Sequence, residues 1–248
     1  MRFDVVTLFP ELFAPFLTVG VTRRAYESGQ VDVQFANPRD YAIGNYRRID
    51  DRPFGGGPGM VMMAEPLSKA LTHIRTQRLD GAPVVLFSPI GKRLDHAMVQ
   101  RWSGSTGAIL ICGRYEGIDQ RFIDAHVDEQ VSLGDFVLSG GEVAAMALLD
   151  AVARLQPGVL SDPDSHHLDS FNPALDGLLD CPHYTRPEEW DGYAVPTVLL
   201  SGNHAHIERW RHEQRLRLSA NHRPDLLAAA RDGGHLSAQD MMNLTDTD

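Results

Sequence analysis

The sequence predicts an α/β fold built on a mainly parallel sheet. Two observations support this prediction: short runs rich in Val, Ile and Leu recur through residues 1–160, and helical stretches lie between them. Continuous apolar runs are typical of strands that are covered on both faces. Because helices alternate with these strands, the strands are expected to run parallel and to be joined by helical crossovers.

The predicted strands, in chain order, are residues 3–9, 31–35, 83–87, 108–112 and 129–133. The predicted helices are residues 21–28, 65–78, 95–102 and 142–155. The last helix has the clearest signal. Gly140 and Gly141 precede it, and steps of three and four residues connect Val143, Met146, Ala147, Asp150 and Arg154.

The character of the chain changes near Gly158. Residues 161–175 contain Asp, Ser, Pro and two adjacent histidines, and this composition predicts a flexible linker. The linker would join a first domain, 1–160, to a smaller and mainly helical domain, 176–248. The best helix there runs from about residue 205 to 219, with one face formed by Ile207, Trp210, Gln214 and Leu218.

Composition excludes several classes of protein. Of the 248 residues, 43% are hydrophobic and 23% are charged, as in ordinary globular proteins. No apolar stretch approaches the roughly 20 residues that span a bilayer, so no membrane partner is expected. The opening MRFDVVTLFPELF is interpreted as a first strand and not as a signal peptide. The two cysteines, Cys112 and Cys181, favour a reducing, cytoplasmic location.

The net charge is 23 − 33 = −10 with neutral histidine. An acidic excess of this size repels nucleic acid at long range, and argues against a general DNA-coating protein. It leaves room for a local basic site. Standard motifs of P-loop nucleotide hydrolases, dinucleotide-binding dehydrogenases, α/β-hydrolases and zinc proteases are not found in the sequence.

Three glycine-bearing segments remain. Residues 52–60, RPFGGGPGM, form either a plain surface turn or a loop whose backbone approaches a ligand closely. Residues 110–118 and 132–142 each run from an apolar strand into a glycine loop, and Pro89 ends another strand in the same way. Ligands of open α/β sheets bind beyond the carboxyl ends of strands, so these loops predict one shared pocket suited to an adenosine-type ligand.

Five segments, in this order, resemble the bacterial tRNA (guanine-N1)-methyltransferases of the TrmD type: RPFGGGPGMVM, LICGRYEGID, SLGDFVLSGGE, LLDCPHYTRP and VLLSGNHAHIERWR. The similarity covers nearly the whole chain. It implies a SPOUT-class parallel sheet that carries a deep trefoil knot. It also implies S-adenosylmethionine as methyl donor, and methylation of N1 of the guanosine at nucleotide 37, immediately 3′ of the anticodon, with a preceding guanosine in the recognised sequence. Family members are homodimers whose active sites are shared between subunits, and they are associated with Mg²⁺, for which the sequence locates no site.

The same resemblance assigns the cofactor pocket residue by residue. The residues implied are Pro89, Gly113, Tyr115, Glu116, Ser132, Leu133, Gly134, Asp135, Phe136, Val137, Leu138, Gly140 and Gly141. Position 136 is Phe where the family commonly has Tyr, so contact there is expected through the backbone or the ring.

Methylation at N1 of guanine requires removal of the N1 proton and stabilisation of the charge that develops on O6. A carboxylate and an arginine suit these roles. The resemblance places the base at Asp169 and the cation at Arg154. Without it, Asp169 would be interpreted as a solvated linker acid, and Arg154 as a cation at a helix end, where positive charge is favourable anyway.

The helix near residue 209 is basic within an acidic chain. The residues expected to contact tRNA are Ser201, Asn203, His204, Arg209, Arg211 and Arg215. The alternative is a solvated helix face with internal ion pairs. Four histidines, His166, His167, His204 and His206, lack a convincing set of fellow ligands, and solvated side chains are preferred to a metal site.

Two other functions are compatible with the sequence. One is a related knotted methyltransferase that acts on a ribose 2′-oxygen, which would not need Asp169 and Arg154 in the same way. The other is an RNA-binding module without catalysis, which would not need intact glycine loops and the Asp169–Phe171 segment.

Overall fold

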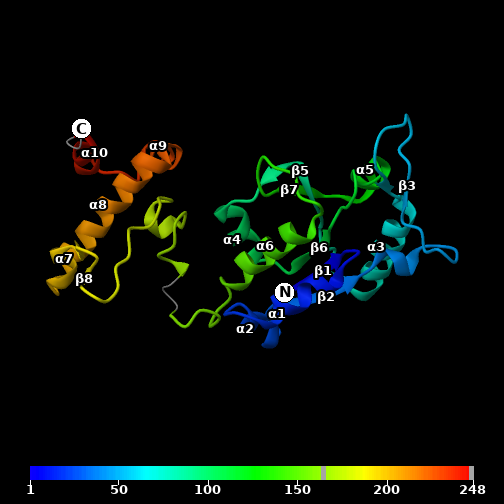
Figure 1. The fold of residues 1–248 in the computed structure, drawn as a ribbon, viewed down its shortest axis with the longest axis horizontal. Helices are drawn as coiled ribbons and strands as arrows, with labels where there is room; N and C mark the ends of the chain where they lie inside the picture. Colours follow the sequence, from blue (N-terminus) through cyan, green and yellow to red (C-terminus); the bar gives the residue numbers. More distant parts are fainter. Residues whose placement is uncertain (163–165, 246–248) are drawn as a thin grey trace. The chain divides into compact units, whose positions relative to one another are not determined.

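The computed structural model describes residues 1–162 and 166–245, and it divides into two compact units, Met1–Ser161 and Asp162–Asp248. The first unit contains a five-stranded parallel sheet with the order β2-β1-β6-β5-β7 (Figure 1). Its strands are β1 (Arg2–Val6), β2 (Asp32–Ala36), β5 (Val84–Arg93), β6 (Gly107–Ile111) and β7 (Glu129–Ser132). The predicted α/β class and parallel sheet are therefore confirmed.

Helices cover both faces of this sheet. The helices of the first unit are α1 (Ala14–Thr18), α2 (Arg23–Glu27), α3 (Ala64–Gln77), α4 (His96–Ser103), α5 (Gln120–His126) and α6 (Glu142–Ala153). Strand residues alternate between two apolar clusters: Val85 packs with α4 and α6 on one face, while Leu86 packs with α3 and α5 on the other. This double burial is the reason the strands are continuously apolar.

The elements of the first unit differ from the predicted ones in several places. β1 ends at Val6, because Pro10 begins a 3-10 helix (Pro10–Phe13) soon after the strand. β5 reaches Arg93, because the chain loops out after Phe87 and then pairs again with β7. Helices α1 and α5 were not predicted, since runs of five and seven residues show little periodicity.

A second 3-10 helix (Pro38–Tyr41) follows β2, and a small antiparallel hairpin, β3 (Asp50–Asp51) and β4 (Val61–Met62), precedes α3. The hairpin is attached to the loop after β6: the Met62 amide donates to Gly117 O at 2.9 Å, and the Asp119 amide donates to Met62 O at 2.9 Å. This hairpin is therefore held beside the carboxyl edge of the sheet.

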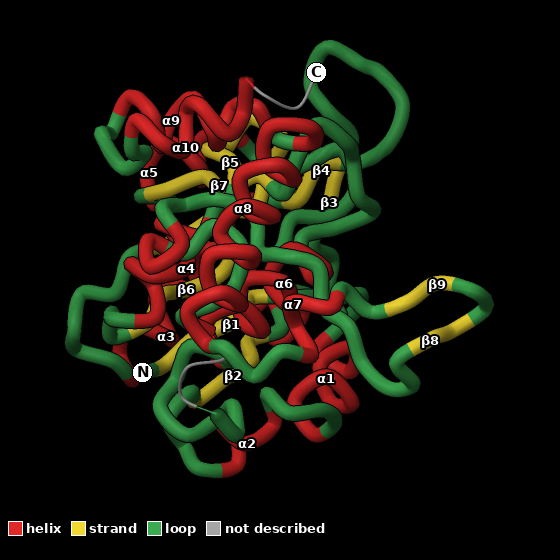
Figure 2. The backbone as a smooth tube through the Cα atoms, turned by 90° about the vertical axis from the view of Figure 1, so that its left-hand side faces the viewer, coloured by secondary structure: helices red, strands yellow, loops and turns green. Residues whose placement is uncertain are grey.

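The second unit is mainly helical. It contains a 3-10 helix (Pro173–Leu175), α7 (Thr197–Leu200), α8 (His204–His222), α9 (Pro224–Asp232) and α10 (Ala238–Thr245), and a hairpin of β8 (Glu189–Trp190) and β9 (Tyr193–Ala194) (Figure 2). Its core joins Leu178, Leu216 and Ala230. The most buried side of α8 carries Leu216 and Ser219, because Leu216 packs against Ala230 of α9. The predicted face centred on Trp210 is only half-buried.

No helix in the described part of the chain is both long and apolar enough to cross a membrane.

Candidate active site

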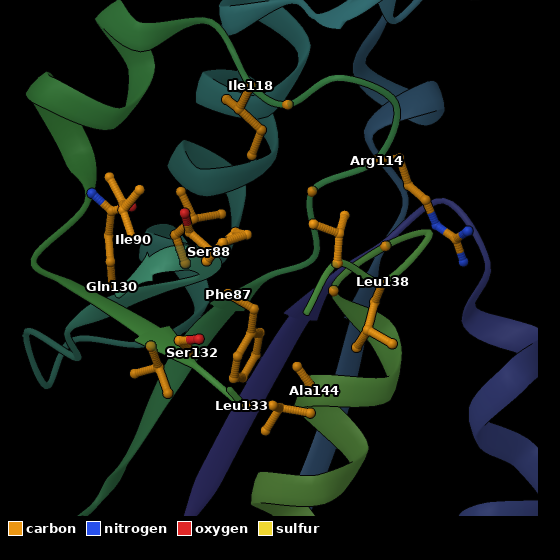
Figure 3. A pocket seen from close by; sticks show the side chains of 18 of the residues that line it. Phe87, Ser88, Ile90, Arg114, Ile118, Gln130, Ser132, Leu133, Leu138 and Ala144 are labelled. Carbon is orange, nitrogen blue, oxygen red and sulfur yellow. The ribbon is translucent and has the colours of Figure 1, made fainter. Parts of the chain in front are cut away.

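A cavity of about 340 Å³ lies at the carboxyl edge of the parallel sheet. Its walls come from the ends of β5, β6 and β7, from the loops that follow them, and from the start of α6 (Figure 3). Open α/β sheets bind ligands at this edge, because loops from several strands converge there. The cavity is therefore the best candidate for a small-molecule site in the first unit.

Most of the predicted cofactor residues line this cavity. They are Pro89, Gly113, Tyr115, Glu116, Ser132, Leu133, Phe136, Val137, Leu138, Gly140 and Gly141. Gly134 and Asp135 belong to the same loop but are not among the lining residues; the exposed Asp135 carboxylate lies 3.3 Å from Arg93 instead. The role of each residue in binding stays a prediction.

Sequence reasoning missed part of the wall. The additional lining residues include Leu86, Phe87, Ser88, Ile90, Ile118, Gln120, Ile123, Gln130, Ser139 and Ala144. The rule that ligands bind beyond strand ends could have indicated the β5 residues, because the predicted strand stops at Phe87. Ile118 and Ile123 carried no usable signal, because their place depends on how α5 packs.

A buried ion pair connects the loop after β6 to the start of α6. Glu142 is 1% exposed, and its Oε2 lies 2.9 Å from Nε of Arg114. The Thr7 hydroxyl donates to Glu142 Oε1 at 2.8 Å, and an Arg114 Nη donates to the Ser139 carbonyl at 3.2 Å. Arg114 lines the cavity, and Figure 3 shows its guanidinium pointing away from the other labelled side chains, so the pair fixes the shape of the wall.

The loops also approach each other through glycine. The Gly141 amide donates to Gly113 O at 3.0 Å. A Cβ at Gly141 would lie only 2.8 Å from the Cα of Cys112, which no ordinary packing allows. Burial raises the pKa of the Cys112 thiol well above its ordinary value, and the Glu142 carboxylate raises it further, so this thiol stays neutral.

The cavity wall contains a buried polar atom that has no partner within the described part of the chain. The side-chain oxygen of Gln130, which lines the cavity, is buried and accepts no hydrogen bond within the described residues. A buried acceptor of this kind is costly unless a ligand or water donates to it. With the apolar side chains and backbone groups around it, this acceptor fits a purine-bearing ligand that carries an amino group.

The predicted base and cation lie in different units. Arg154 follows α6 in the first unit, where its amide donates to Asp150 O at 3.0 Å. Asp169 is half-buried in the second unit, and its carbonyl accepts from the Asn172 amide at 3.2 Å. Asn172 is 4% exposed, and its side-chain amide donates to His166 O at 2.9 Å. These bonds fold the described residues after 165 into compact turns; residues 163–165 of the predicted linker lie outside the described residues.

The predicted tRNA-contacting residues surround the first turns of α8. Asn203 caps the helix, because its side chain accepts from the His206 amide at 3.3 Å, and Ser201 and His204 beside it are exposed. Arg209 and Arg211 are exposed as well.

Arg215 differs from the other arginines of α8. It is 7% exposed, and lies 3.1 Å from Glu208 and 3.8 Å from Asp180. Arg211 also lies 3.5 Å from Glu208, but its side chain is 45% exposed, so burial is what sets Arg215 apart. Both pairs are internal ion pairs of the kind that the alternative interpretation of this helix expects.

Among the described residues, no group of three or more His, Cys, Asp or Glu side chains is arranged to hold a metal ion. Cys112 and Cys181 are both buried free thiols.

The sequence profile of the family described as tRNA (Guanine-1)-methyltransferase TrmD matches residues 1–229, which include the whole cavity. The chain belongs to this family. It is therefore a bacterial enzyme of the tRNA (guanine-N1)-methyltransferase type.

Individual relatives of the TrmD family agree with this assignment. The chain is 75% identical to a protein of Albidiferax ferrireducens named tRNA (guanine-N(1)-)-methyltransferase, over 97% of this chain and 97% of the relative. The identity is 70% in Polaromonas sp., over 99% of this chain and 96% of the relative. The identity to the relative in Bordetella pertussis is 57%, over 97% of this chain and 95% of the relative.

Proposed function

We propose that the enzyme transfers a methyl group from S-adenosylmethionine to N1 of the guanosine at tRNA nucleotide 37, immediately 3′ of the anticodon, with a preceding guanosine as part of the recognised sequence. The observation that carries the proposal is the cavity at the carboxyl edge of the sheet, lined by most of the residues that the family resemblance assigns to cofactor binding. The bound donor supplies a methyl group on a positively charged sulfur. The relatives named tRNA (guanine-N(1)-)-methyltransferase support guanine N1 as the acceptor over a ribose oxygen.

The protein holds the donor through the loops after β5, β6 and β7. Gln130 offers an unpaired oxygen to an amino group, and Leu133, Leu138 and Ala144 offer apolar contact. The buried pair of Glu142 and Arg114 keeps two of the loops together. Binding is thus mainly a property of preformed backbone and rigid side chains.

Asp169 serves as the general base, and Arg154 stabilises the negative charge that develops on guanine O6. The Asp169 carboxylate takes the N1 proton while N1 forms its bond to the methyl carbon and the bond from that carbon to sulfur breaks, so that the electron pair returns to sulfur and cancels its positive charge. The neutral base would be a poor nucleophile without this transfer. Arg154 suits its role because guanidinium remains charged and presents a planar set of donors.

The proposal includes four further features of the family. The parallel sheet carries a deep trefoil knot, the enzyme is a homodimer whose active site is shared between subunits, it works in the cytoplasm, and the exposed arginines of α8 contact the anticodon stem-loop. Support for the last feature is the exposure of Arg209 and Arg211.

Nucleoside analysis of tRNA tests the proposal directly. Purified enzyme is incubated with S-adenosylmethionine and a tRNA transcript that has guanosine at nucleotides 36 and 37. We expect 1-methylguanosine, and none with a transcript that has adenosine at nucleotide 37. Methylation of a ribose, or no methylation while the donor is bound, would contradict the proposal.

A further inference from the structure

The segment 43–60 is an exposed arm at the rim of the cavity. It contains the residues before β3 and the loop between β3 and β4, and the β3 region extends outward from the sheet in Figure 1. Gly55, Gly56 and Gly57 all have positive φ, and a Cβ at any of them would meet open space. These glycines make a protruding turn that no other part of the described chain packs against.

Two aromatic side chains on the arm are almost wholly exposed. Tyr46 is 94% exposed and Phe54 is 101% exposed, while Ile49 between them is buried and anchors the arm in the core. Exposed aromatic rings gathered on one segment are unusual on a soluble surface and mark binding sites. The arm is therefore built to present rings to something outside the chain.

The arm is also basic. Its arginines are Arg47, Arg48 and Arg52 and its acids are Asp50 and Asp51, which gives 3 − 2 = +1 in a chain of net charge −10. Arg47 pairs with Asp40 at 3.1 Å and Arg48 pairs with Asp51, but the Arg52 guanidinium has no ion pair in the described part of the chain. Aromatic rings interleaved with arginines are typical of surfaces that bind single-stranded nucleic acid.

The base of the arm is joined to the wall of the cavity. The Glu116 amide donates to Met60 O at 3.0 Å, and a Cβ at Gly59 would collide with the Glu116 side chain. Glu116 and Gly117, which accepts from Met62, both line the cavity. A molecule held by the arm would therefore lie next to whatever occupies the cavity.

We infer that segment 43–60 is an RNA-binding arm, in which Tyr46 and Phe54 stack on unpaired bases that flank the target guanine while Arg52 contacts a phosphate. This inference rests on the proposed function, because it takes the RNA substrate from there. Stacking fits loop RNA, since every unpaired base offers a face to an aromatic ring. An interface with a second copy of the chain is the other occupant of such a surface, and the experiment distinguishes the two.

Binding of a fluorescent anticodon stem-loop RNA to the full-length protein tests the arm. The double variant Tyr46→Ala/Phe54→Ala should bind this RNA at least about tenfold more weakly, because each stacked base contributes appreciably to affinity. The double variant Tyr46→Phe/Phe54→Trp, which retains both rings, should bind like wild type. Leu79→Ala is the matched control, because Leu79 is 95% exposed but precedes β5, at the opposite edge of the sheet.

Two further measurements complete the experiment. In the alanine double variant, the affinity for S-adenosylmethionine and the native mass should be unchanged. In Arg52→Gln, the slope of RNA affinity against salt concentration should fall by about the amount that one phosphate contact contributes. Unchanged RNA affinity in the double variant, or loss of the native assembly, would overturn the inference. If the wild-type protein neither binds nor methylates RNA, the proposed function is wrong as well. If the wild-type protein is active and the double variant binds RNA with the same affinity, only the RNA-binding role of the arm is wrong.

Discussion

The carboxylate of Glu142 lies 2.9 Å from the Nε of Arg114, and this ion pair joins the first turn of α6 to the loop after β6. Glu142 is almost fully buried, and the Arg114 side chain is 18% exposed and lies over the Phe9 ring. Thr7 Oγ1 completes the set of contacts by donating to the same carboxylate. Three chain segments that are far apart in the sequence thus meet at one buried charge.

Glu142→Ala should destabilise the protein by about 3 kcal/mol, because it leaves the Arg114 charge partly buried without its partner. The affinity for S-adenosylmethionine should fall too, since the pair holds two cavity loops. Urea unfolding and calorimetry measure the two effects. In the double variant Glu142→Gln/Arg114→Gln both charges are gone, and we expect a smaller loss of stability. Wild-type stability of Glu142→Ala would mean that the pair contributes nothing.

Gly141→Ala should weaken binding of S-adenosylmethionine and destabilise the fold by about 1–3 kcal/mol, because the new methyl group would force the loops after β6 and β7 apart. The distance of 2.8 Å to Cys112 Cα is the reason. Gly104→Ala is the matched control, since a Cβ there meets only atoms 3.9 Å or more away. Calorimetry measures the affinity of both variants for S-adenosylmethionine, and thermal unfolding measures their stability. Equal affinity and equal stability of the two variants would show that the loops can separate without a free-energy cost.

The parallel sheet was predictable from the sequence because burial on both faces leaves a direct mark on composition. Every residue of β6 is buried, so Gly107–Ile111 shows an uninterrupted apolar run. The loop inside β5 left no such mark. It depends on Lys92 and Arg93 pairing again with β7, a contact between segments about 40 residues apart.

The site was predictable where its function depends on backbone. Gly140 and Gly141 are visible in a sequence because close approach excludes side chains there, whereas a Cβ at Gly113 would make only ordinary contacts of 3.6 Å or more. Gln130 was not predictable, since nothing in a strand sequence tells which polar side chain faces a cavity. The burial of Arg215 was missed for a similar reason: Asp180, which lies near it, comes from a segment about 35 residues earlier.

Asp169→Ala should lower the rate of tRNA methylation by about 100-fold or more, because general-base catalysis contributes that much. The affinity for S-adenosylmethionine should be unchanged. Single-turnover methylation and calorimetry separate the two effects. Asp162→Asn serves as the control, because Asp162 is an exposed acid of the same acidic stretch. Substantial methylation by Asp169→Ala would return this residue to the alternative role of a solvated acid.

Asp80→Asn should make the free energy of unfolding depend less on pH in acid. The Arg78 guanidinium donates to the Asp80 carboxylate and lowers the pKa of that carboxyl from 3.8 to about 2. A carboxyl whose pKa is lower in the folded state stabilises the fold above its unfolded pKa, and the contribution is lost as the pH falls from about 4 to about 2. Asp80 is 35% exposed, so screening limits the contribution to about 1 kcal/mol. Urea unfolding from pH 7 to pH 2 measures it; a variant that loses stability over this window as steeply as wild type would contradict the assignment.

The arginines of α8 should separate into two kinds. Arg209 and Arg211 are exposed, so the double variant Arg209→Gln/Arg211→Gln should reduce both the affinity for tRNA and the slope of its dependence on salt, by about one to two phosphate contacts, without loss of stability. Arg215→Gln should instead destabilise the second unit, because it removes a buried guanidinium and leaves the 20% exposed Asp180 without it, while the exposed Glu208 keeps Arg211. Filter binding at several salt concentrations and urea unfolding distinguish these outcomes. If Arg215→Gln lowers the salt slope of tRNA binding at wild-type stability, Arg215 contacts RNA despite its burial, and the division between the two kinds of arginine is wrong.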